Sequence, residues 1–217
     1  MTFEFPPEII QRLRTTRVVA GFSVDRAEHA VPIARALLAG GIDAIELTLR
    51  TPAALDGLNA ICGEVPEMLT GVGTILSPEL VAEVKNAGAD FGVAPGLNPR
   101  VVRRAIEVGL PFAPGIATPS DVEAAIELGC KLVKFFPAEA SGGVTYLRGM
   151  SAPYKHLGIH YFPLGGLNAD NMMDYLGEPN VLAVGGSWIV KNEMVLQEDW
   201  AGITARAADV MKKLEGK

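Results

Sequence analysis

Cysteine and histidine are scarce in this sequence, and each scarcity narrows the range of possible functions. The 217 residues include only 2 cysteines and 3 histidines. Two isolated cysteines cannot form a disulfide framework, so we interpret Cys62 and Cys130 as buried free thiols in a reducing cytosol. His29, His156 and His160 do not form a cluster with the spacing of metal ligands, so we expect no metal and no other cofactor.

An excess of positive charge and long apolar runs are also lacking. The formal net charge is −6, which argues against a nucleic-acid-binding protein, because contacts to a phosphate backbone require a basic surface. No apolar run reaches the roughly 18 residues that a membrane-spanning helix needs. The N-terminal segment also lacks the basic start and apolar core of a signal peptide. We therefore expect a cytoplasmic protein with neither a nucleic acid nor a membrane as its partner.

The sequence does contain a repeat that glycine marks. Gly41, Gly88, Gly109 and Gly129 each follow a helix-like segment and precede a strand-like one. A glycine at this place relieves the left-handed strain at the end of a helix. The glycines are separated by about 20 residues or by about twice that, which is the period of strand, loop and helix units around a parallel sheet.

Strands and helices can be placed on this repeat. We predict eight strands, at residues 17–24, 43–50, 68–73, 90–95, 111–115, 131–136, 159–164 and 181–185. We predict a helix after each strand, at residues 26–39, 52–62, 77–87, 98–108, 118–128, 144–151, 168–176 and 200–215. Four helix starts, at Thr51, Ser77, Asn98 and Thr118, combine an N-cap residue with a following proline.

Eight such units in one chain indicate an α/β protein with a single (β/α)₈ barrel, the TIM barrel, over residues 1–217. The segment before Arg17 would form an extra N-terminal helix that covers the bottom of the barrel. An open doubly wound sheet is the alternative, but it normally has a dominant glycine-rich turn after its first strand, which RVVAGFSV lacks. The barrel directs attention to the C-terminal ends of the strands, because active sites of this fold lie there.

From Ile45 on, the second predicted strand, DAIELTLR, carries polar residues on one face only. Its even positions there are Glu46, Thr48 and Arg50, and its odd positions are Ile45, Leu47 and Leu49. Side chains alternate between the two faces of a strand, so the apolar face packs on helices and the polar face points into the barrel. An edge strand with one wet face is the alternative, but both faces of a parallel barrel strand are covered. We predict functional roles for Glu46 and Arg50, and Thr48 could instead pack in the interior.

The sixth predicted strand, KLVKFF, contains a lysine in an apolar run. Lys134 has the same parity as Leu132 and Phe136 and lies late in the strand, so it points inward near the C-terminal end. Apolar surroundings disfavour the charged ammonium, and a neutral amine attacks a carbonyl to form a Schiff base. A lysine that reaches out to solvent at the barrel mouth is the alternative. Lys131 lies at the start of the strand, and we interpret it as a solvated charge.

Two Gly-Gly turns follow the last two predicted strands, in PLGGLNADN (163–171) and AVGGSW (183–188). Glycine lets backbone N–H groups approach an anion closely, and the start of a following helix favours negative charge. Barrels often bind phosphate with these two loops, although turn chemistry alone is the alternative. Thr74 and Pro95 lie at two further strand ends, where the shape of the chain alone also explains them.

Seven segments between about residues 17 and 190 carry a family resemblance: GGIDAIELTLRTP, GVGTILSPE, VAPGLNP, PGIATPSDV, VKFFPAEASGG, PLGGLN and AVGGSW. Together they resemble the 2-keto-3-deoxy-6-phosphogluconate (KDPG) and 4-hydroxy-2-oxoglutarate (KHG) aldolases. The resemblance implies a metal-free class I aldolase on a TIM barrel, acting on a small 2-keto acid. It also implies a homotrimer, which is the usual assembly of the characterised members.

The resemblance assigns roles to individual residues. It implies that Lys134 forms the Schiff base and that Glu46 is the general acid/base. Arg50 and Thr74 would bind the carboxylate end of the 2-keto acid, and Pro95 would shape that pocket. The resemblance further implies a phosphate site, made by Gly165, Gly166, Gly186 and Ser187.

The implied reaction cleaves KDPG to pyruvate and glyceraldehyde 3-phosphate, with KHG, which gives pyruvate and glyoxylate, as a shorter substrate. Two departures from the family pattern bear on the substrate. Leu164 stands where many KDPG aldolases have threonine, and the first strand reads VVAGFSV. A related aldolase for the 6-phosphogalactonate stereoisomer is therefore an alternative. A barrel that binds phosphate without aldol chemistry, or a phosphosugar epimerase, are others, but neither requires both Lys134 and Glu46.

Overall fold

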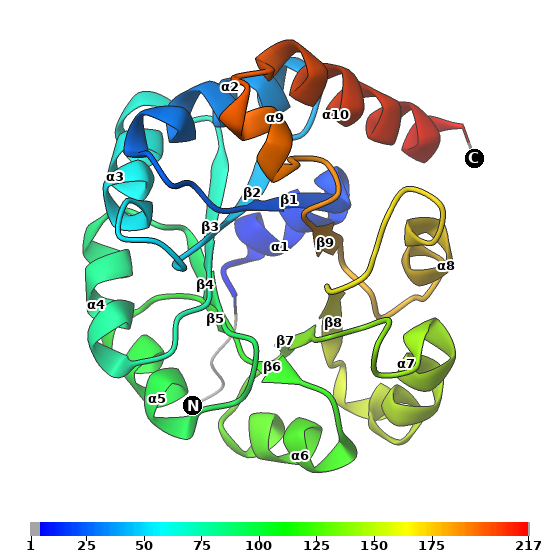
Figure 1. Cartoon of the computed structure of the whole chain (residues 1–217). Coiled ribbons are helices and arrows are strands. Elements are labelled where there is room, and N and C mark those ends of the chain that lie inside the picture. The colour runs from blue at the N-terminus through cyan, green and yellow to red at the C-terminus, as the bar shows by residue number, and fades with distance from the viewer. Residues whose placement is uncertain (1–4, 217) are drawn as a thin grey trace.

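Short strands alternate with helices along the chain, as the glycine repeat predicts. The computed structural model describes residues 5–216, and residues 1–4 and 217, which the single-domain prediction includes, lie outside the described residues. Figure 1 shows the strands inside a ring of helices. No helix within 5–216 is both long and apolar enough to cross a membrane.

All strand pairs are parallel, as predicted. The strands are β1 (Val18–Phe22), β2 (Ala44–Thr48), β3 (Leu69–Gly73), β4 (Phe91–Val93), β5 (Phe112–Ala113), β6 (Gly115–Ile116), β7 (Leu132–Phe135), β8 (His160–Pro163) and β9 (Val184–Gly186). They form one sheet in the order β5-β4-β3-β2-β1-β9 and a second in the order β6-β7-β8. An isolated parallel bridge between Leu164 and Gly185 links the ends of β8 and β9. The α/β class with a parallel sheet is therefore confirmed.

The predicted strand 111–115 is two strands, β5 and β6. Pro114 separates them, and proline has no N–H to donate to a neighbouring strand. Its carbonyl oxygen still accepts a hydrogen bond from the backbone N–H of Lys134, at 2.8 Å. The chain is thus continuous from one sheet to the other at this point.

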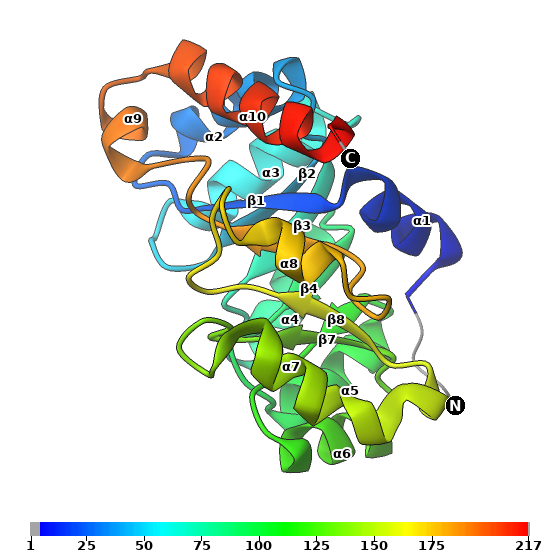
Figure 2. The same cartoon turned by 90° about the vertical axis from the view of Figure 1, so that its right-hand side faces the viewer.

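Helices follow most strands. They are α1 (Pro7–Thr16), α2 (Ala30–Ala39), α3 (Ala54–Glu64), α4 (Pro78–Asn86), α5 (Pro99–Val108), α6 (Pro119–Glu127), α7 (Gly143–Ser151), α8 (Met172–Leu176), α9 (Asn192–Leu196) and α10 (Trp200–Glu215). Two 3₁₀ helices, η1 (Ala27–His29) and η2 (Ala152–Leu157), complete the helices of residues 5–216. Figure 2 shows α1 at the end where the strands begin and α9 at the opposite end.

Three of the four predicted helix starts are confirmed. Ser77, Asn98 and Thr118 are N-caps whose side-chain oxygens accept backbone N–H groups of the first turn, each with proline next in sequence. The start at Thr51 is wrong, because its hydroxyl donates to the carbonyl of Val24 instead. Helix α3 consequently begins only at Ala54, without a side-chain cap.

Two other helix predictions also need correction, and one helix was missed. The predicted helix 26–39 begins with the 3₁₀ turn η1, and α2 starts only at Ala30. The predicted helix 168–176 is shorter, because the Asn168 side chain accepts the backbone N–H of Asp170 at 2.8 Å and holds a turn before α8. Helix α9 was not predicted at all.

Two clusters of buried apolar residues lie on the two faces of the strands. The larger cluster packs the strands against the helices and includes Ile45 and Val133. The smaller cluster lies on the opposite faces of the strands and includes Ala44 and Leu132, which pack with Leu13 of α1. Glu46 and Lys134 have the parity of this smaller cluster, so strand alternation places both on the inner face, as predicted.

Glycines on the inner face make room for large neighbours. A Cβ built on Gly71 would lie 2.7 Å from a ring carbon of Phe91. A Cβ built on Gly73 would lie 2.7 Å from Cδ of Glu46 and closer still to Oε1. Neither glycine can carry a side chain while its partner keeps this position.

Candidate active site

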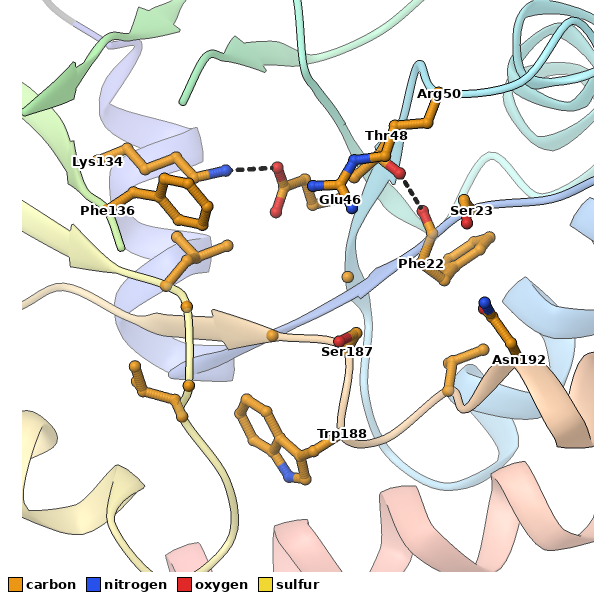
Figure 3. Close-up of a pocket in the computed structure, with 17 residues that line it drawn as sticks. Phe22, Ser23, Glu46, Thr48, Arg50, Lys134, Phe136, Ser187, Trp188 and Asn192 are labelled. Atoms are coloured by element: carbon orange, nitrogen blue, oxygen red, sulfur yellow. Dashed lines mark hydrogen bonds and ion pairs between the residues drawn. The ribbon is translucent and has the colours of Figure 1, made fainter. Parts of the chain in front are cut away.

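A cavity of about 370 Å³ opens at the C-terminal ends of the strands. Its walls come from the ends of β1, β2 and β7 and from the turns that follow β8 and β9. Figure 3 shows the polar side chains converging on it. Seven of the nine predicted site residues line it, and they are Glu46, Arg50, Lys134, Gly165, Gly166, Gly186 and Ser187.

Lys134 and Glu46 meet at the inner end of this cavity. Nζ of Lys134 lies 2.7 Å from Oε1 of Glu46, and the two residues are 5% and 3% exposed. Nζ also lies 5.2 Å from the ring centre of Phe136, which covers one side of the amine. The pair joins β7 to β2 across the interior, from positions 88 residues apart in the sequence.

The backbone around Glu46 explains why a carboxylate fits at a buried position. In the sheet, Glu46 pairs with Gly21 of β1 and with Gly71 of β3, so neither neighbouring strand places a side chain beside it. The carboxylate is compensated by the ammonium of Lys134, as a buried charge must be. A proton that moves from the ammonium to the carboxylate would leave a neutral amine and a neutral acid, and this arrangement suits nucleophilic attack followed by acid/base catalysis.

The two other polar residues of the predicted second strand, Thr48 and Arg50, differ from each other in burial and position. Thr48 is buried, and its hydroxyl donates to the carbonyl of Phe22 at 3.1 Å, so its main contact joins β2 to β1. Arg50 is exposed, lies past the end of β2 and points toward Glu46 across the cavity mouth. Its guanidinium is therefore free to meet an anionic ligand near Lys134, and guanidinium matches carboxylate in planar geometry.

Thr74 and Pro95 are the two predicted site residues that do not line this cavity in the described chain. Thr74 directly follows β3 and has φ of 65°, in the left-handed region. This backbone turns the chain away from the direction of the strand, so strand alternation no longer places the side chain. Their binding roles stay predictions.

The two Gly-Gly turns lie side by side at the cavity wall. Gly165 and Gly166 have φ of 95° and 85°, a left-handed conformation that glycine adopts without strain. Gly186 ends β9, and the exposed hydroxyl of Ser187 faces the same space. The helices after these turns begin only at 172 and 192, so they do not adjoin the glycines as expected. An anion here would meet backbone N–H groups and the hydroxyl.

Four further polar or aromatic side chains line the cavity and were missed by sequence reasoning: Phe22, Ser23, Trp188 and Asn192. Ser23 directly follows β1, so its place at a strand end was the available signal. Trp188 adjoins the second Gly-Gly turn, and Asn192 begins α9, the helix that was not predicted. Leu164 also lines the cavity and offers it no hydrogen-bonding group.

Lys131 lies at the other end of its strand, away from Lys134. It is half-buried, and its Nζ donates to the carbonyl of Leu157 at 3.0 Å. Cys62 and Cys130 are both free thiols, and burial is the main reason that their pKa values rise to about 11 and about 12. Within 5–216, no group of three or more His, Cys, Asp or Glu side chains is arranged to hold a metal ion.

Comparison with known proteins gives one consistent result. The chain matches the model of the KDPG and KHG aldolase family over residues 9–206. The KHG/KDPG aldolase of Escherichia coli (strain K12) is 42% identical over 200 residues, which cover 92% of this chain and 93% of that protein.

Two solved structures are also similar. The Legionella pneumophila KDPG aldolase, with pyruvate captured at low pH as a covalent carbinolamine intermediate, has a TM-score of 0.89 at 35% identity, covering 94% of this chain and 98% of that chain. The Zymomonas mobilis ZM4 KDPG aldolase, solved with 3-phosphoglycerate, has a TM-score of 0.85 at 35% identity, covering 93% and 94%.

Proposed function

The chain belongs to the KDPG and KHG aldolase family and is a carbon–carbon lyase, and we propose that Lys134 and Glu46 carry out its reaction. The substrate is a 2-keto-3-deoxy-6-phospho sugar acid, which is cleaved to pyruvate and glyceraldehyde 3-phosphate, and KHG is a shorter substrate. The observation that carries the assignment of these two residues is the buried contact of 2.7 Å between Nζ and Oε1 inside the cavity.

The reaction begins when the neutral amine of Lys134 attacks the C2 carbonyl of the substrate. The carbinolamine takes a proton from the Glu46 acid and loses water to give a cationic iminium, which acts as an electron sink. Glu46 removes the proton of the C4 hydroxyl, the C3–C4 bond breaks, and the aldehyde leaves. The enamine that remains takes a proton at C3, and hydrolysis frees pyruvate and the amine. The covalent pyruvate adduct of the Legionella pneumophila relative supports this order.

The two ends of the substrate would be held at two sides of the cavity. Arg50 binds the carboxylate next to the Schiff base, because its guanidinium points toward Glu46. The phosphate binds at the two Gly-Gly turns, which line the cavity together with Ser187. Ser187 lies across the cavity from Arg50. The Zymomonas mobilis relative was solved with 3-phosphoglycerate, a three-carbon phosphate. No metal takes part, since the iminium supplies the electron sink.

We further propose that the two sheets form one closed eight-stranded barrel, with β5 and β6 as two parts of one strand. Support comes from the bridge between Leu164 and Gly185, which joins β8 to β9, and from the pairing of β9 with β1. Residues 1–217 then make one domain. The homotrimer rests on the family resemblance, and light scattering should give about three times the chain mass of 22.9 kDa. A cytoplasmic location is consistent with the two free thiols.

A trapping experiment tests the central assignment. The protein is incubated with pyruvate, reduced with borohydride, and digested for mass spectrometry. We expect one adduct, on the peptide that contains Lys134, because borohydride reduction of the iminium leaves pyruvate attached to the lysine as a stable secondary amine, whereas reduced free pyruvate stays unattached. Lys131→Ala is the matched control, since Lys131 lies on the same strand segment but outside the cavity, and it should keep the adduct. An adduct elsewhere, or none, would show that Lys134 is not the nucleophile.

A further inference from the structure

The carbonyl groups of the first Gly-Gly turn are bound from outside the cavity. The oxygen of Gly165 accepts the backbone N–H of Glu139 at 3.0 Å, and that of Gly166 accepts Nδ2 of Asn171 at 3.3 Å. In a planar trans peptide, the carbonyl and the next N–H point in opposite directions. The N–H groups of Gly166 and Leu167 therefore point away from these partners, and within 5–216 they donate to no protein acceptor.

Glu139 also contacts the turn through its side chain. A Cβ built on Gly166 would lie 2.6 Å from Cβ of Glu139 and 2.8 Å from Cγ, so the stem of Glu139 lies directly against this glycine. Its carboxylate accepts a hydrogen bond from the hydroxyl of Tyr175. Tyr175 belongs to α8 and is 1% exposed, so its ring cannot shift without repacking.

The Tyr175 hydroxyl remains protonated and able to donate. Burial first, and then the hydrogen bond to Glu139, raise the pKa of Tyr175 above its usual range. The contact therefore ties the segment after β7 to the helix that follows the Gly-Gly turn, and Figures 1 and 2 show these two regions as neighbours. Glu139 lies five residues after Lys134 in KFFPAE, so one short segment links the nucleophile to the turn.

We infer that Glu139, oriented by Tyr175, is a positioning residue for the phosphate of the substrate. It acts through the Gly165–Gly166 turn, by keeping the carbonyls outward and the N–H groups of Gly166 and Leu167 toward the cavity. The inference rests on the proposed phosphate site. Its effect should appear in KM and not in kcat, because the turn would hold the phosphate in the same way before and during the chemical step.

Tyr175→Phe tests this inference, because it keeps the ring and removes only the donor. We expect KM for the phosphorylated substrate to rise about three- to tenfold, the effect of one weakened hydrogen-bonding arrangement, with kcat unchanged. Inhibition by inorganic phosphate should weaken by a similar factor. For 2-keto-3-deoxygluconate, which lacks the phosphate, kcat/KM should not change. Tyr154→Phe is the matched control, because Tyr154 donates to another carboxylate, Glu123, at 3.1 Å.

Two variants of Glu139 separate positioning from general structural support. Glu139→Gln keeps an acceptor for Tyr175 and should leave KM for the phosphorylated substrate no higher than that of the wild type. Glu139→Ala should raise KM as Tyr175→Phe does. Because Glu139 is exposed, Glu139→Ala can replace Tyr175→Phe in the test if the change at buried Tyr175 prevents folding.

The outcomes separate this inference from the proposed function. Equal losses with both substrates, or an unchanged KM for the phosphorylated one, would overturn the positioning role of Glu139 while pyruvate still labels Lys134. Absence of that label in the wild-type protein would overturn the proposed function itself. A selective loss with the phosphorylated substrate, together with a normal label, is the result that we expect.

Discussion

Gly73→Ala should disable the enzyme by displacing Glu46. The new Cβ would lie 2.7 Å from Cδ and 2.9 Å from Cγ of Glu46. Carbon atoms in contact normally lie about 3.5 Å or more apart, so the carboxylate must retreat by about 1 Å. That shift breaks the contact of 2.7 Å between Oε1 and Nζ of Lys134.

A catalytic group misplaced by about 1 Å can lower the rate about 100-fold, and we expect kcat of Gly73→Ala to fall by about that factor. Loss of acid/base catalysis altogether would lower it by up to about 10⁴-fold. The thermal midpoint should fall, because the displaced carboxylate no longer compensates the buried ammonium of Lys134, but the chain should still fold, because the carboxylate can move into the open cavity. Pyruvate should still label Lys134, whose amine is unchanged.

The assay measures the release of pyruvate at saturating substrate. A coupling dehydrogenase reduces the pyruvate, and the consumption of NADH is recorded. Gly63→Ala is the matched control, because no atom lies within 4 Å of a Cβ built there, and its kcat should equal that of the wild type. A Gly73→Ala enzyme that turns over at the wild-type rate would show that the position of Glu46 does not limit catalysis. We expect a folded Gly73→Ala protein that pyruvate still labels at Lys134 and whose kcat is low.

Two further substitutions follow from the geometry. Gly166→Ala places a Cβ at φ of 85° and 2.6 Å from Cβ of Glu139, so KM for the phosphorylated substrate should rise at least about tenfold, and an unchanged KM in steady-state kinetics would contradict the phosphate site. Asp121→Ala removes the capping box with Thr118 and should lower the free energy of unfolding at pH 7 by about 1 kcal/mol in urea titrations. Burial raises the pKa of the Asp121 carboxyl, but hydrogen bonds from Ala117 and Thr118 outweigh it and hold this pKa below its usual range. The stabilisation by Asp121 is therefore fully present above its pKa in the unfolded chain, and it disappears as the pH falls through its lower pKa in the folded chain. If the free energy of unfolding of Asp121→Ala is still lower than that of the wild type below that pH, the stabilisation does not come from the ionised carboxylate.

Strand alternation was sufficient to predict the centre of the site. Glu46 and Lys134 are on the inner face because side chains alternate with a period of two, and this period does not depend on tertiary contacts. The same reasoning fails where the strand ends. Thr74 is one residue past β3 with a left-handed backbone, so its direction could not be read from parity.

Loop geometry accounts for most of the other differences. The start at Thr51 was mispredicted because its hydroxyl has a better acceptor in Val24, which is 27 residues away in the sequence. Helix α9 is only five residues long and too short to show a periodic pattern, so Asn192 was missed with it. A contact between distant segments decides the first case, and the shortness of the helix decides the second, and one sequence alone reveals neither.

The interior glycines have a consequence for the history of this protein. The Phe91 ring occupies the space that a side chain at position 71 would need, and Glu46 occupies the space that a side chain at position 73 would need. The sizes of the two residues in each pair are therefore coupled. A mutation that enlarges one member is deleterious until the other shrinks, which makes the first step along that evolutionary path a loss of fitness. Random drift at such positions is therefore blocked one residue at a time, and the buried carboxylate of Glu46 is inherited together with the absence of a side chain at Gly73 on the neighbouring strand.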